Sequence, residues 1–400
     1  MPSQLHDARS NGRTLVFSAI RRNAPVARVD IAKITNLSPA TVTSITAELL
    51  TAGLIEEVAV ENSGVAGKRG RPRVDLKIRG AAHIVVGIKL SDNSATYSFL
   101  DFEGKKIAGY VHPSAQETYC LPELMTFLTD GYSAALTDAG LEESSISGMG
   151  LGLPGVVDAE AGIVLWSPVL IEKNQPLQQK LADTFSIPVF IDNDANLVAV
   201  AEKHIGLGKN AQNFVVITVE QGVGLGIVIN GKIYRGTKGC GAELGHTKVQ
   251  LDGALCRCGQ RGCLEAYVGD YALLREAGTA MGPLEGANPQ EQMQALLAAA
   301  KKGNTVAQSI IRRAGRMFSM GLANVVNIFA PELIILSGER LQDSFLYGDE
   351  VINDMKKYAV QSGDLMPEVK IHSWDNQMWS IGAATFAIDG IIDIALAKIR

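Results

Sequence analysis

Long apolar runs are absent from this sequence of 400 residues. No stretch reaches the roughly 18 consecutive apolar residues of a membrane-spanning helix, so we expect no transmembrane segment. The N-terminal residues Met1–Asp7 also lack the basic and then apolar segments of a secretory signal. These absences predict a cytoplasmic protein with no membrane partner.

Cysteine is scarce, and its count is odd. Three of the five cysteines fall within residues 256–263, a pattern that argues against a secreted disulfide framework and favours a metal site in a cytosolic protein. Cys120 and Cys240 lie outside this cluster, and we expect them to be ordinary small apolar residues.

The chain is not short of apolar residues, which make up 46%, while charged residues make up 20%. That balance excludes a disordered chain, and the length predicts two or three domains. The net charge of −5 hides a split: residues 1–80 carry 12 basic and 7 acidic side chains, and residues 81–400 carry 25 and 35. A basic head on an acidic body indicates a nucleic-acid-binding segment.

The head has the pattern of a helix-turn-helix. We expect helices over residues 10–22 and 30–34, and a third helix from Pro39 to about Ala52 that Ser38 caps and Gly53 ends. The alternative is a helical hairpin used only for packing. The face opposite the apolar stripe of the third helix is small and polar, which suits a DNA major groove. It offers Ser38, Ala40, Thr41, Thr43 and Ser44.

A cationic loop follows between two extended segments, Leu54–Val60 and Val74–Ile78. This is the position of a β-wing, where basic side chains reach phosphates or a narrow minor groove. The alternative is a solvated linker. The candidate DNA-binding side chains in this loop are Lys68, Arg69, Arg71 and Arg73.

Strands interleaved with helices follow from Ile84 onward and predict an α/β body. We expect a β-meander over residues 84–108, a helix over roughly residues 121–139 and another over residues 197–204. Glycine-rich stretches follow or continue several strands, and a second set of strands begins at Phe214. Because ligands bind at the carboxyl ends of strands in such folds, we expect two hinged lobes with a cleft between them.

The strongest local signal is Cys256-x-Cys258-x4-Cys263, with His246 ten residues before it. Three thiolates and one imidazole satisfy tetrahedral structural Zn²⁺ and leave no open position. The alternative is three buried free cysteines.

Polar side chains surround this motif at glycine-rich segments. Glu243, His246 and Glu265, with Asn193 and Asp194 from an earlier strand end, form a set suited to sugar hydroxyls. A histidine can ligate zinc through one ring nitrogen and donate a hydrogen bond from the other. Each residue alone could equally be a solvated charge or a helix cap.

Three motifs together resemble the ROK family of repressors, open reading frames and kinases. They are Asn193-Asp194-Ala195-Asn196, Gly241-Ala242-Glu243-Leu244-Gly245-His246 and Cys256-x-Cys258-Gly-x-x-Gly-Cys263-x-Glu265. The head, with Gly70-Arg71-Pro72, resembles the winged helix-turn-helix of the family's repressor branch.

The resemblance implies a fold, a domain plan and residue roles. The fold is an N-terminal winged helix-turn-helix plus a two-lobed actin-like, ribonuclease-H-like ATPase fold. The domains are 1–80 for the head, 81–196 for a small lobe completed by 382–400, and 197–381 for a large lobe. The roles are sugar binding at Asn193, Asp194, Glu243, His246 and Glu265, and structural zinc at His246, Cys256, Cys258 and Cys263. In family kinases the residue matching Asp194 is the general base.

One stretch separates kinase from regulator. Family kinases carry an Asp-x-Gly-Gly-Thr loop at the phosphates of ATP, where this chain has Lys89-Leu90-Ser91-Asp92-Asn93. Without glycine the backbone cannot approach a phosphate closely. A second stretch, Gly222-x-Gly224-x-Gly226, is present but weak evidence alone. Val169 also replaces an asparagine common in members that bind glucose-like sugars, which predicts an unusual effector.

We therefore expect a regulator without enzymatic activity. It would bind an inverted-repeat operator in double-stranded DNA as a dimer or tetramer, under control of a sugar effector. The signal would pass through the linker near Arg79-Gly80. The alternative is a sugar kinase with a fused DNA-binding head.

Overall fold

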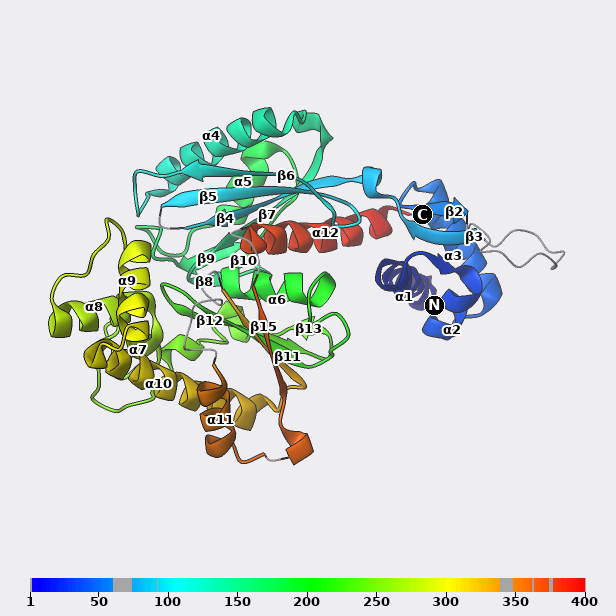
Figure 1. Ribbon diagram of the computed structural model, residues 1–400. Helices are drawn as coiled ribbons and strands as arrows, with labels where there is room; N and C mark the ends of the chain where they lie inside the picture. The colour runs from blue at the N-terminus through cyan, green and yellow to red at the C-terminus, as the bar shows by residue number, and fades with distance from the viewer. Residues whose placement is uncertain are drawn as a thin grey trace. The chain divides into compact units, whose positions relative to one another are not determined.

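The computed structural model describes residues 2–59, 74–91, 93–338, 348–361, 363–373 and 377–399 (Figure 1). The chain divides into two compact units. The first comprises residues 1–151, 176–191 and 383–400, and the second comprises 152–175 and 192–382. Neither unit is one continuous segment, because the chain passes between them more than once.

The head of the first unit is three helices and a small antiparallel sheet of order β1-β3-β2. Ser38 caps the third helix, because its hydroxyl accepts the Thr41 amide at 3.1 Å, and Gly53 follows that helix at a φ of +69°. The bounds are α1 Pro2–Asn23, β1 Val26–Ala27, α2 Arg28–Thr35, α3 Pro39–Thr51, β2 Ile55–Ala59 and β3 Val74–Ile78.

The predicted helix-turn-helix and its flanking strands are present. The first helix was expected over 10–22 and is longer, because it begins at Pro2. Its buried face joins the other helices in a core of Val16, Ile20, Ile31, Val42 and Leu49. The loop with Lys68, Arg69, Arg71 and Arg73 lies outside the described residues.

A five-stranded sheet of order β10-β7-β4-β5-β6 forms the rest of the first unit's framework. Strands β4, β5 and β6 pair antiparallel as a meander, as the sequence predicts. The strands are β4 Ile84–Leu90, β5 Ser94–Asp101, β6 Lys106–Pro113, β7 Ile146–Leu153 and β10 Val189–Asn193, and the helices are α4 Leu121–Ala139, α5 Leu177–Phe185 and α12 Met378–Lys398.

Helix α12 is long and apolar enough to cross a membrane by length and composition, and 61% of its most apolar window is buried. The helix contains no long uninterrupted apolar run, because Asp389 and Asp393 lie within it. A side chain at Gly150 of β7 would come within 1.9 Å of the Ala383 carbonyl oxygen. This close packing against a strand is that of a core helix.

The second unit is built on another five-stranded sheet, of order β13-β12-β11-β14-β15. Strand β14 pairs parallel with both β11 and β15, and β12 pairs antiparallel with β11. The strands are β11 Phe214–Val219, β12 Val223–Ile229, β13 Lys232–Ile233, β14 Leu333–Ser337 and β15 Glu368–His372, with a separate hairpin of β8 Val156–Asp158 and β9 Ile163–Trp166.

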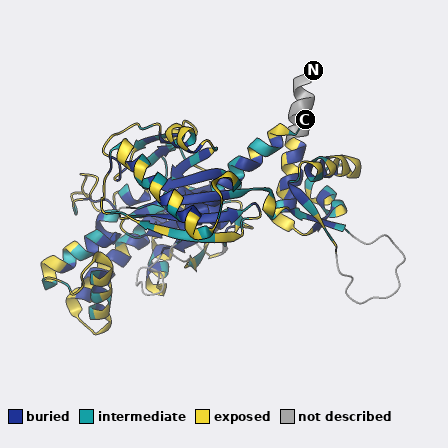
Figure 2. Cartoon of the chain, turned by 90° about the horizontal axis from the view of Figure 1, so that it is seen from above, coloured by how far each residue is buried: buried dark blue, intermediate teal, exposed yellow. Residues whose placement is uncertain are grey.

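Helices pack around this second sheet, whose strands β11 and β14 are buried whereas its edge strands β13 and β15 are partly exposed. Figure 2 shows exposed residues along several helices. The α/β body expected from the sequence is confirmed. The helices are α6 Asp194–His204, α7 Glu265–Val268, α8 Asp270–Met281, α9 Pro289–Lys301, α10 Thr305–Phe329 and α11 Asp349–Tyr358.

The glycines of β12 have a packing role. A Cβ at Gly226 would lie 2.5 Å from the Ala195 carbonyl oxygen and 2.6 Å from the Ala199 Cβ, and one at Gly224 would lie 2.9 Å from the Ala195 Cβ. These glycines therefore let α6 rest directly on β12. Packing against α6 is enough to explain these glycines, without a role in phosphate binding.

Candidate metal and ligand site

Four side chains of the second unit converge on one point. One ligand atom from each of His246, Cys256, Cys258 and Cys263 lies within 4.8 Å of all the others. The Cys256 Sγ lies 3.7 Å from the His246 Nδ1, and the Cys258 Sγ lies 3.7 Å from the Cys263 Sγ. Cys256 and Cys263 are buried and Cys258 is exposed. This cluster could hold a metal ion.

The knuckle that carries the cysteines depends on two glycines in left-handed conformations. Gly259 has a φ of +84° and Gly262 a φ of +75°. A Cβ at Gly262 would lie 1.8 Å from the Gln250 carbonyl oxygen, so this position admits only glycine. The turn is closed by the Cys256 amide, which donates to the Gln260 carbonyl oxygen at 2.8 Å.

Other side chains, Lys248 and Tyr271 among them, also touch the sulfur atoms. The Lys248 Nζ lies 3.0 Å from the Cys263 Sγ and donates to the His246 carbonyl oxygen at 3.1 Å. The Tyr271 hydroxyl lies 3.6 Å from the Cys256 Sγ. Burial raises the pKa of the Cys256 thiol to about 12. A bound cation would have to displace that proton, so metal affinity should fall as pH falls.

The predicted ligand-binding acids lie beside this cluster. The Glu265 Oε1 is 3.7 Å from the Cys256 Sγ, and the Glu243 Oε2 is 4.0 Å from the His246 Nε2. Loss of solvent raises the pKa of Glu243, His246 opposes this, and the carboxylates of Glu265 and Asp194 add to the rise. The histidine thus turns Nδ1 toward the sulfurs and Nε2 toward Glu243.

Asn193 and Asp194 stand where β10 passes into α6. The Asn193 Oδ1 caps the helix by accepting the Ala195 amide at 2.9 Å, and its Nδ2 donates to the Gly155 carbonyl oxygen at 2.8 Å. Asp194 also accepts the Ala195 amide. The sequence prediction began this helix at Leu197, which was wrong, because capping by Asn193 starts it three residues earlier.

The sequence reasoning missed an ion pair under this site. Asp192 is fully buried, and its carboxylate accepts from the Arg235 Nε at 2.7 Å and the Asn196 Nδ2 at 2.9 Å. Burial raises the pKa of Asp192, and Arg235 and the hydrogen bonds oppose that rise. The pair ties the strand end before Asn193 to the start of the loop that leads to Glu243.

One minor expectation needs correction. Cys240 is exposed, so it fills no core, and Cys120 is half-buried at the start of α4. Neither belongs to the metal cluster, as the sequence predicted. Val169 is fully buried, so its side chain packs inside the protein.

The residues compared above with the phosphate loop of family kinases lie at the end of β4 and the start of the hairpin to β5. Lys89 pairs with Thr96, and Leu90 is fully buried opposite Ala95. The Ser91 amide donates to the Ser94 carbonyl oxygen at 2.9 Å. Asp92 lies outside the described residues.

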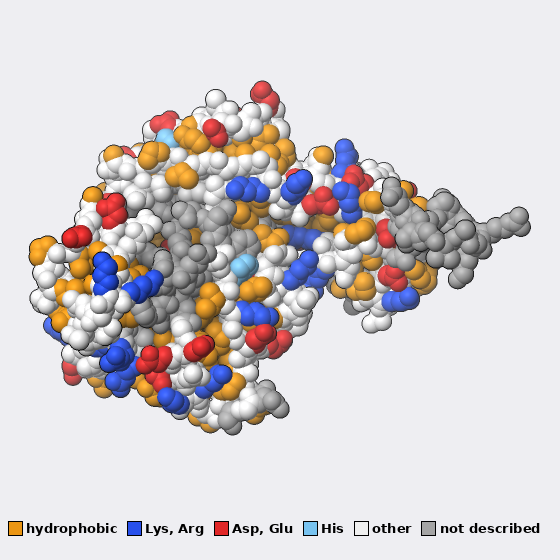
Figure 3. All heavy atoms as spheres, viewed as in Figure 1, with side chains coloured by type: hydrophobic (Ala, Val, Ile, Leu, Met, Phe, Trp, Pro, Cys, Tyr) orange, Lys and Arg blue, Asp and Glu red, His pale blue; other side chains and the backbone are white. Residues whose placement is uncertain are grey.

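The predicted DNA-reading side chains of the head are exposed on one stretch of α3 and its cap. They are Ser38, Ala40, Thr41, Thr43 and Ser44. Basic and acidic side chains stand near each other on the face of the head that Figure 3 shows.

Several basic residues of the head are engaged in ion pairs. Arg13 pairs with Glu48, Arg21 with Asp389, Arg28 with Glu57, and Lys77 with Glu56 and Glu103. Much of the positive charge counted in the head is therefore paired with carboxylates of the first unit. The four basic residues of residues 60–73 are a large part of the remainder.

The chain is similar to known proteins. Residues 113–389 match the ROK family. The chain belongs to the ROK family. It is 31% identical to the xylose repressor of Caldicellulosiruptor bescii over 89% of this chain and 90% of the relative.

Two solved structures bear on the fold. A ROK family transcriptional regulator, a homologue of the E. coli MLC protein, superposes with a TM-score of 0.81 and 26% identity, over 98% of this chain and 99% of that one. The ROK hexokinase from Thermus thermophilus superposes with a TM-score of 0.65 and 27% identity, over 77% of this chain and 99% of that one. The regulator matches nearly the whole chain, whereas the kinase in its full length matches about three quarters of it.

Proposed function

We propose that this chain is a DNA-binding transcriptional regulator, a repressor of carbohydrate genes, whose affinity for its operator is set by a sugar or sugar derivative. The observation that carries the proposal is the match over 98% of the chain to a ROK transcriptional regulator. The exposed face of α3 supports it. So does the likeness to a xylose repressor over 89% of the chain.

For DNA binding, α3 enters the major groove with Ser38, Ala40, Thr41, Thr43 and Ser44 toward the bases. Lys68, Arg69, Arg71 and Arg73 add phosphate or minor-groove contacts. Two copies of the chain, or four, read an inverted repeat, because a two-fold symmetric protein requires a symmetric operator. The protein acts in the cytoplasm.

For the effector, Asn193, Asp194, Glu243, His246 and Glu265 hold the sugar hydroxyls. The charge interactions of Glu243 with Asp194, His246 and Glu265 support this grouping. All five residues belong to the second unit. We also propose domain limits at residues 80, 196 and 381, with residues 382–400 completing the small lobe. These limits differ from the two compact units, because they assign Asn193 and Asp194 to the small lobe.

The metal is structural Zn²⁺ held by His246, Cys256, Cys258 and Cys263. In a tetrahedral zinc site, bonds of about 2.3 Å to sulfur and 2.0–2.1 Å to nitrogen place neighbouring ligand atoms roughly 3.6–3.8 Å apart. The Cys256–His246 and Cys258–Cys263 separations of 3.7 Å fit that geometry. Three thiolates and Zn²⁺ carry one net negative charge, and Lys248 beside Cys263 offsets it.

A sugar kinase with a fused head is the second candidate. Likeness of the body to the ROK hexokinase favours it. Against it stand the lack of glycine in Lys89–Asn93 and the packing role of Gly224 and Gly226.

ATP-dependent phosphorylation over a panel of hexoses, pentoses and their N-acetyl derivatives separates the two candidates. The regulator proposal predicts no turnover above that of an Asp194→Asn variant. Multiple turnovers that Asp194→Asn abolishes would establish the kinase.

A thermal-shift screen with the same panel identifies the effector, because a ligand that binds only the folded protein raises the melting temperature by mass action. We expect one class of sugar to stabilise the wild type and to lose that effect in Glu243→Gln. If no sugar in the panel raised the melting temperature, the proposal that the effector is a sugar would be wrong.

A further inference from the structure

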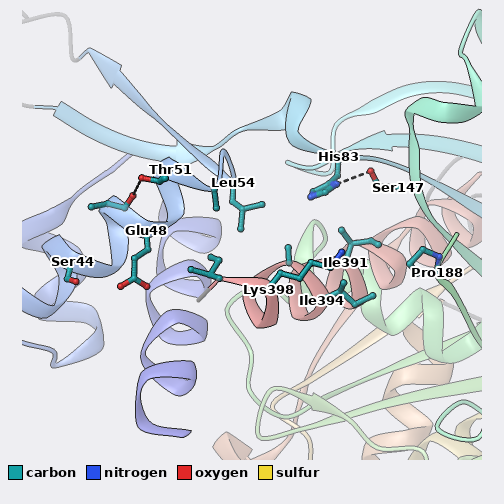
Figure 4. A pocket seen from close by; sticks show the side chains of 14 residues that line it. Ser44, Glu48, Thr51, Leu54, His83, Ser147, Pro188, Ile391, Ile394 and Lys398 are labelled. Atoms are coloured by element: carbon teal, nitrogen blue, oxygen red, sulfur yellow. Dashed lines mark hydrogen bonds between the residues drawn. The ribbon is translucent and has the colours of Figure 1, made fainter. Parts of the chain in front are cut away.

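The first unit holds a cavity of about 910 Å³ that none of the candidate sugar or metal ligands lines. Figure 4 shows it between the C-terminal half of α3 and the last turns of α12. Small-molecule sites usually measure about 300–1,000 Å³ and combine apolar walls with a few convergent polar groups. This cavity has both the size and the composition.

Its walls are largely apolar. Ala47 and Leu54 line the side formed by the head, and Ile391 and Ile394 line the side formed by α12. Pro188 closes the wall near β10. A hydrocarbon group in this space would remove these side chains from water, which contributes about 25 cal/mol per Å² of apolar surface.

His83 and Ser147 lie together on one wall, while Ser44, Glu48 and Thr51 lie on α3. The His83 Nδ1 lies 2.8 Å from the Ser147 Oγ. Burial lowers the pKa of His83, and the nearby Lys398 ammonium lowers it further. The second ring nitrogen of the neutral His83 side chain can therefore bind a ligand, and the Lys398 ammonium can bind a negative charge.

The second charged residue of the lining is already neutralised. The Glu48 carboxylate accepts from the Arg13 Nε at 2.8 Å, and the Arg13 Nη1 donates to the Ile399 carbonyl oxygen at 2.7 Å. Arg13 is itself buried. Lys398 therefore gives the lining of the cavity a positive charge, which favours the binding of an anion.

We propose that this cavity binds a small monocarboxylic acid with a hydrocarbon body, its carboxylate at Lys398 and its chain between the α3 and α12 walls. The site is separate from the proposed sugar site, whose residues all belong to the second unit. Because Ser44 of the proposed DNA-reading face also lines the cavity, an occupant touches the helix that reads DNA. The protein thus has a second ligand input next to α3.

Calorimetric titration of the full-length protein with hexanoate and with hexanol tests the proposal. We expect hexanoate to bind at one site per chain and hexanol, which lacks the charge, to bind at least about five-fold more weakly. Lys398→Met keeps the length of the side chain and removes its charge. This substitution should lower the affinity for hexanoate about five-fold and leave the affinity for hexanol unchanged.

Two more variants complete the test. Lys356→Met removes an exposed lysine from the last turn of α11 in the second unit, and hexanoate binding should equal that of the wild type. Ile394→Trp fills the cavity and should abolish binding of both ligands, with an unchanged circular dichroism spectrum.

Absence of saturable hexanoate binding would overturn the proposal. So would equal binding of hexanol, or hexanoate affinity that survives Lys398→Met. If Ile394→Trp fails to fold, the comparison of Lys398→Met with Lys356→Met still decides.

Discussion

Asp192 shows how one buried charge organises the candidate ligand site. Its carboxylate is held by Arg235 and Asn196, and it accepts the backbone amide of Asn193 at 2.8 Å. These contacts hold the backbone next to Asn193 and Asp194 in place. A buried ion pair adds little net stability, but loss of one partner leaves an uncompensated charge and costs several kcal/mol.

Arg235→Ala should lower the free energy of unfolding by about 3 kcal/mol near neutral pH. Because the folded pKa of Asp192 is already raised, removal of the cation should raise it further. A raised folded pKa means that the folded state binds the extra proton, so the deficit should shrink as pH falls toward about 5.5.

Urea unfolding at both pH values measures this deficit. Arg312→Ala, an exposed arginine of α10, is the matched control and should change nothing. A variant Arg235→Ala that unfolds like the wild type at neutral pH would show that Asp192 does not depend on Arg235.

At the scale of elements, local signals in the sequence predicted much of the structure because they act over a few residues. Ser38, Pro39 and Gly53 mark the ends of α3, and α4 has the predicted bounds Leu121–Ala139. The cysteine spacing predicted the cluster with His246.

What the sequence did not reveal depends on contacts between distant segments. Arg235 is 43 residues from Asp192, and the cavity joins α3 to α12 from opposite ends of the chain. The start of α6 was missed because Asn193 was interpreted as a ligand, whereas it is also the helix cap. The spacing of residues along the sequence does not reveal contacts between positions so far apart.

Ser38→Ala should destabilise the head by about 1 kcal/mol, because the Thr41 amide loses its capping hydroxyl. Thr43→Ala is the control: its exposed hydroxyl donates to the Pro39 carbonyl oxygen within the same helix, and its removal should have little effect. Thermal unfolding followed by circular dichroism compares them. Equal melting temperatures for the two variants would contradict the role of the cap.

Cys258→Ser should remove zinc and lower the melting temperature, because structural zinc contributes folding free energy. Elemental analysis of the purified protein should find one zinc per chain in the wild type and in Cys240→Ser, whose cysteine is exposed outside the cluster. A zinc-free wild type, or full occupancy in Cys258→Ser, would refute the site.

At the scale of the whole molecule, net charge is a poor guide and its distribution is a better one. The chain carries −5 in total, while residues 1–80 carry +5. Ion pairs within the first unit use several of those cations, such as Arg13 with Glu48. The basic residues at 68–73 are therefore the main candidates for phosphate contacts.

Arg71→Ala should weaken operator binding and reduce the slope of log affinity against log salt concentration by about 1. Lys302→Ala, a basic residue of the second unit, should leave both unchanged. Fluorescence anisotropy with labelled DNA over a series of salt concentrations gives the slope. An unaltered slope in Arg71→Ala would remove this residue from the interface.

Selection of DNA from a random duplex library by the full-length protein shows whether the protein reads a defined operator. We expect enrichment of an inverted repeat whose half-sites lie a whole number of helical turns apart, and whose binding changes when the stabilising sugar is added. Retention of DNA without enrichment of any sequence would contradict a regulator that reads an operator through α3.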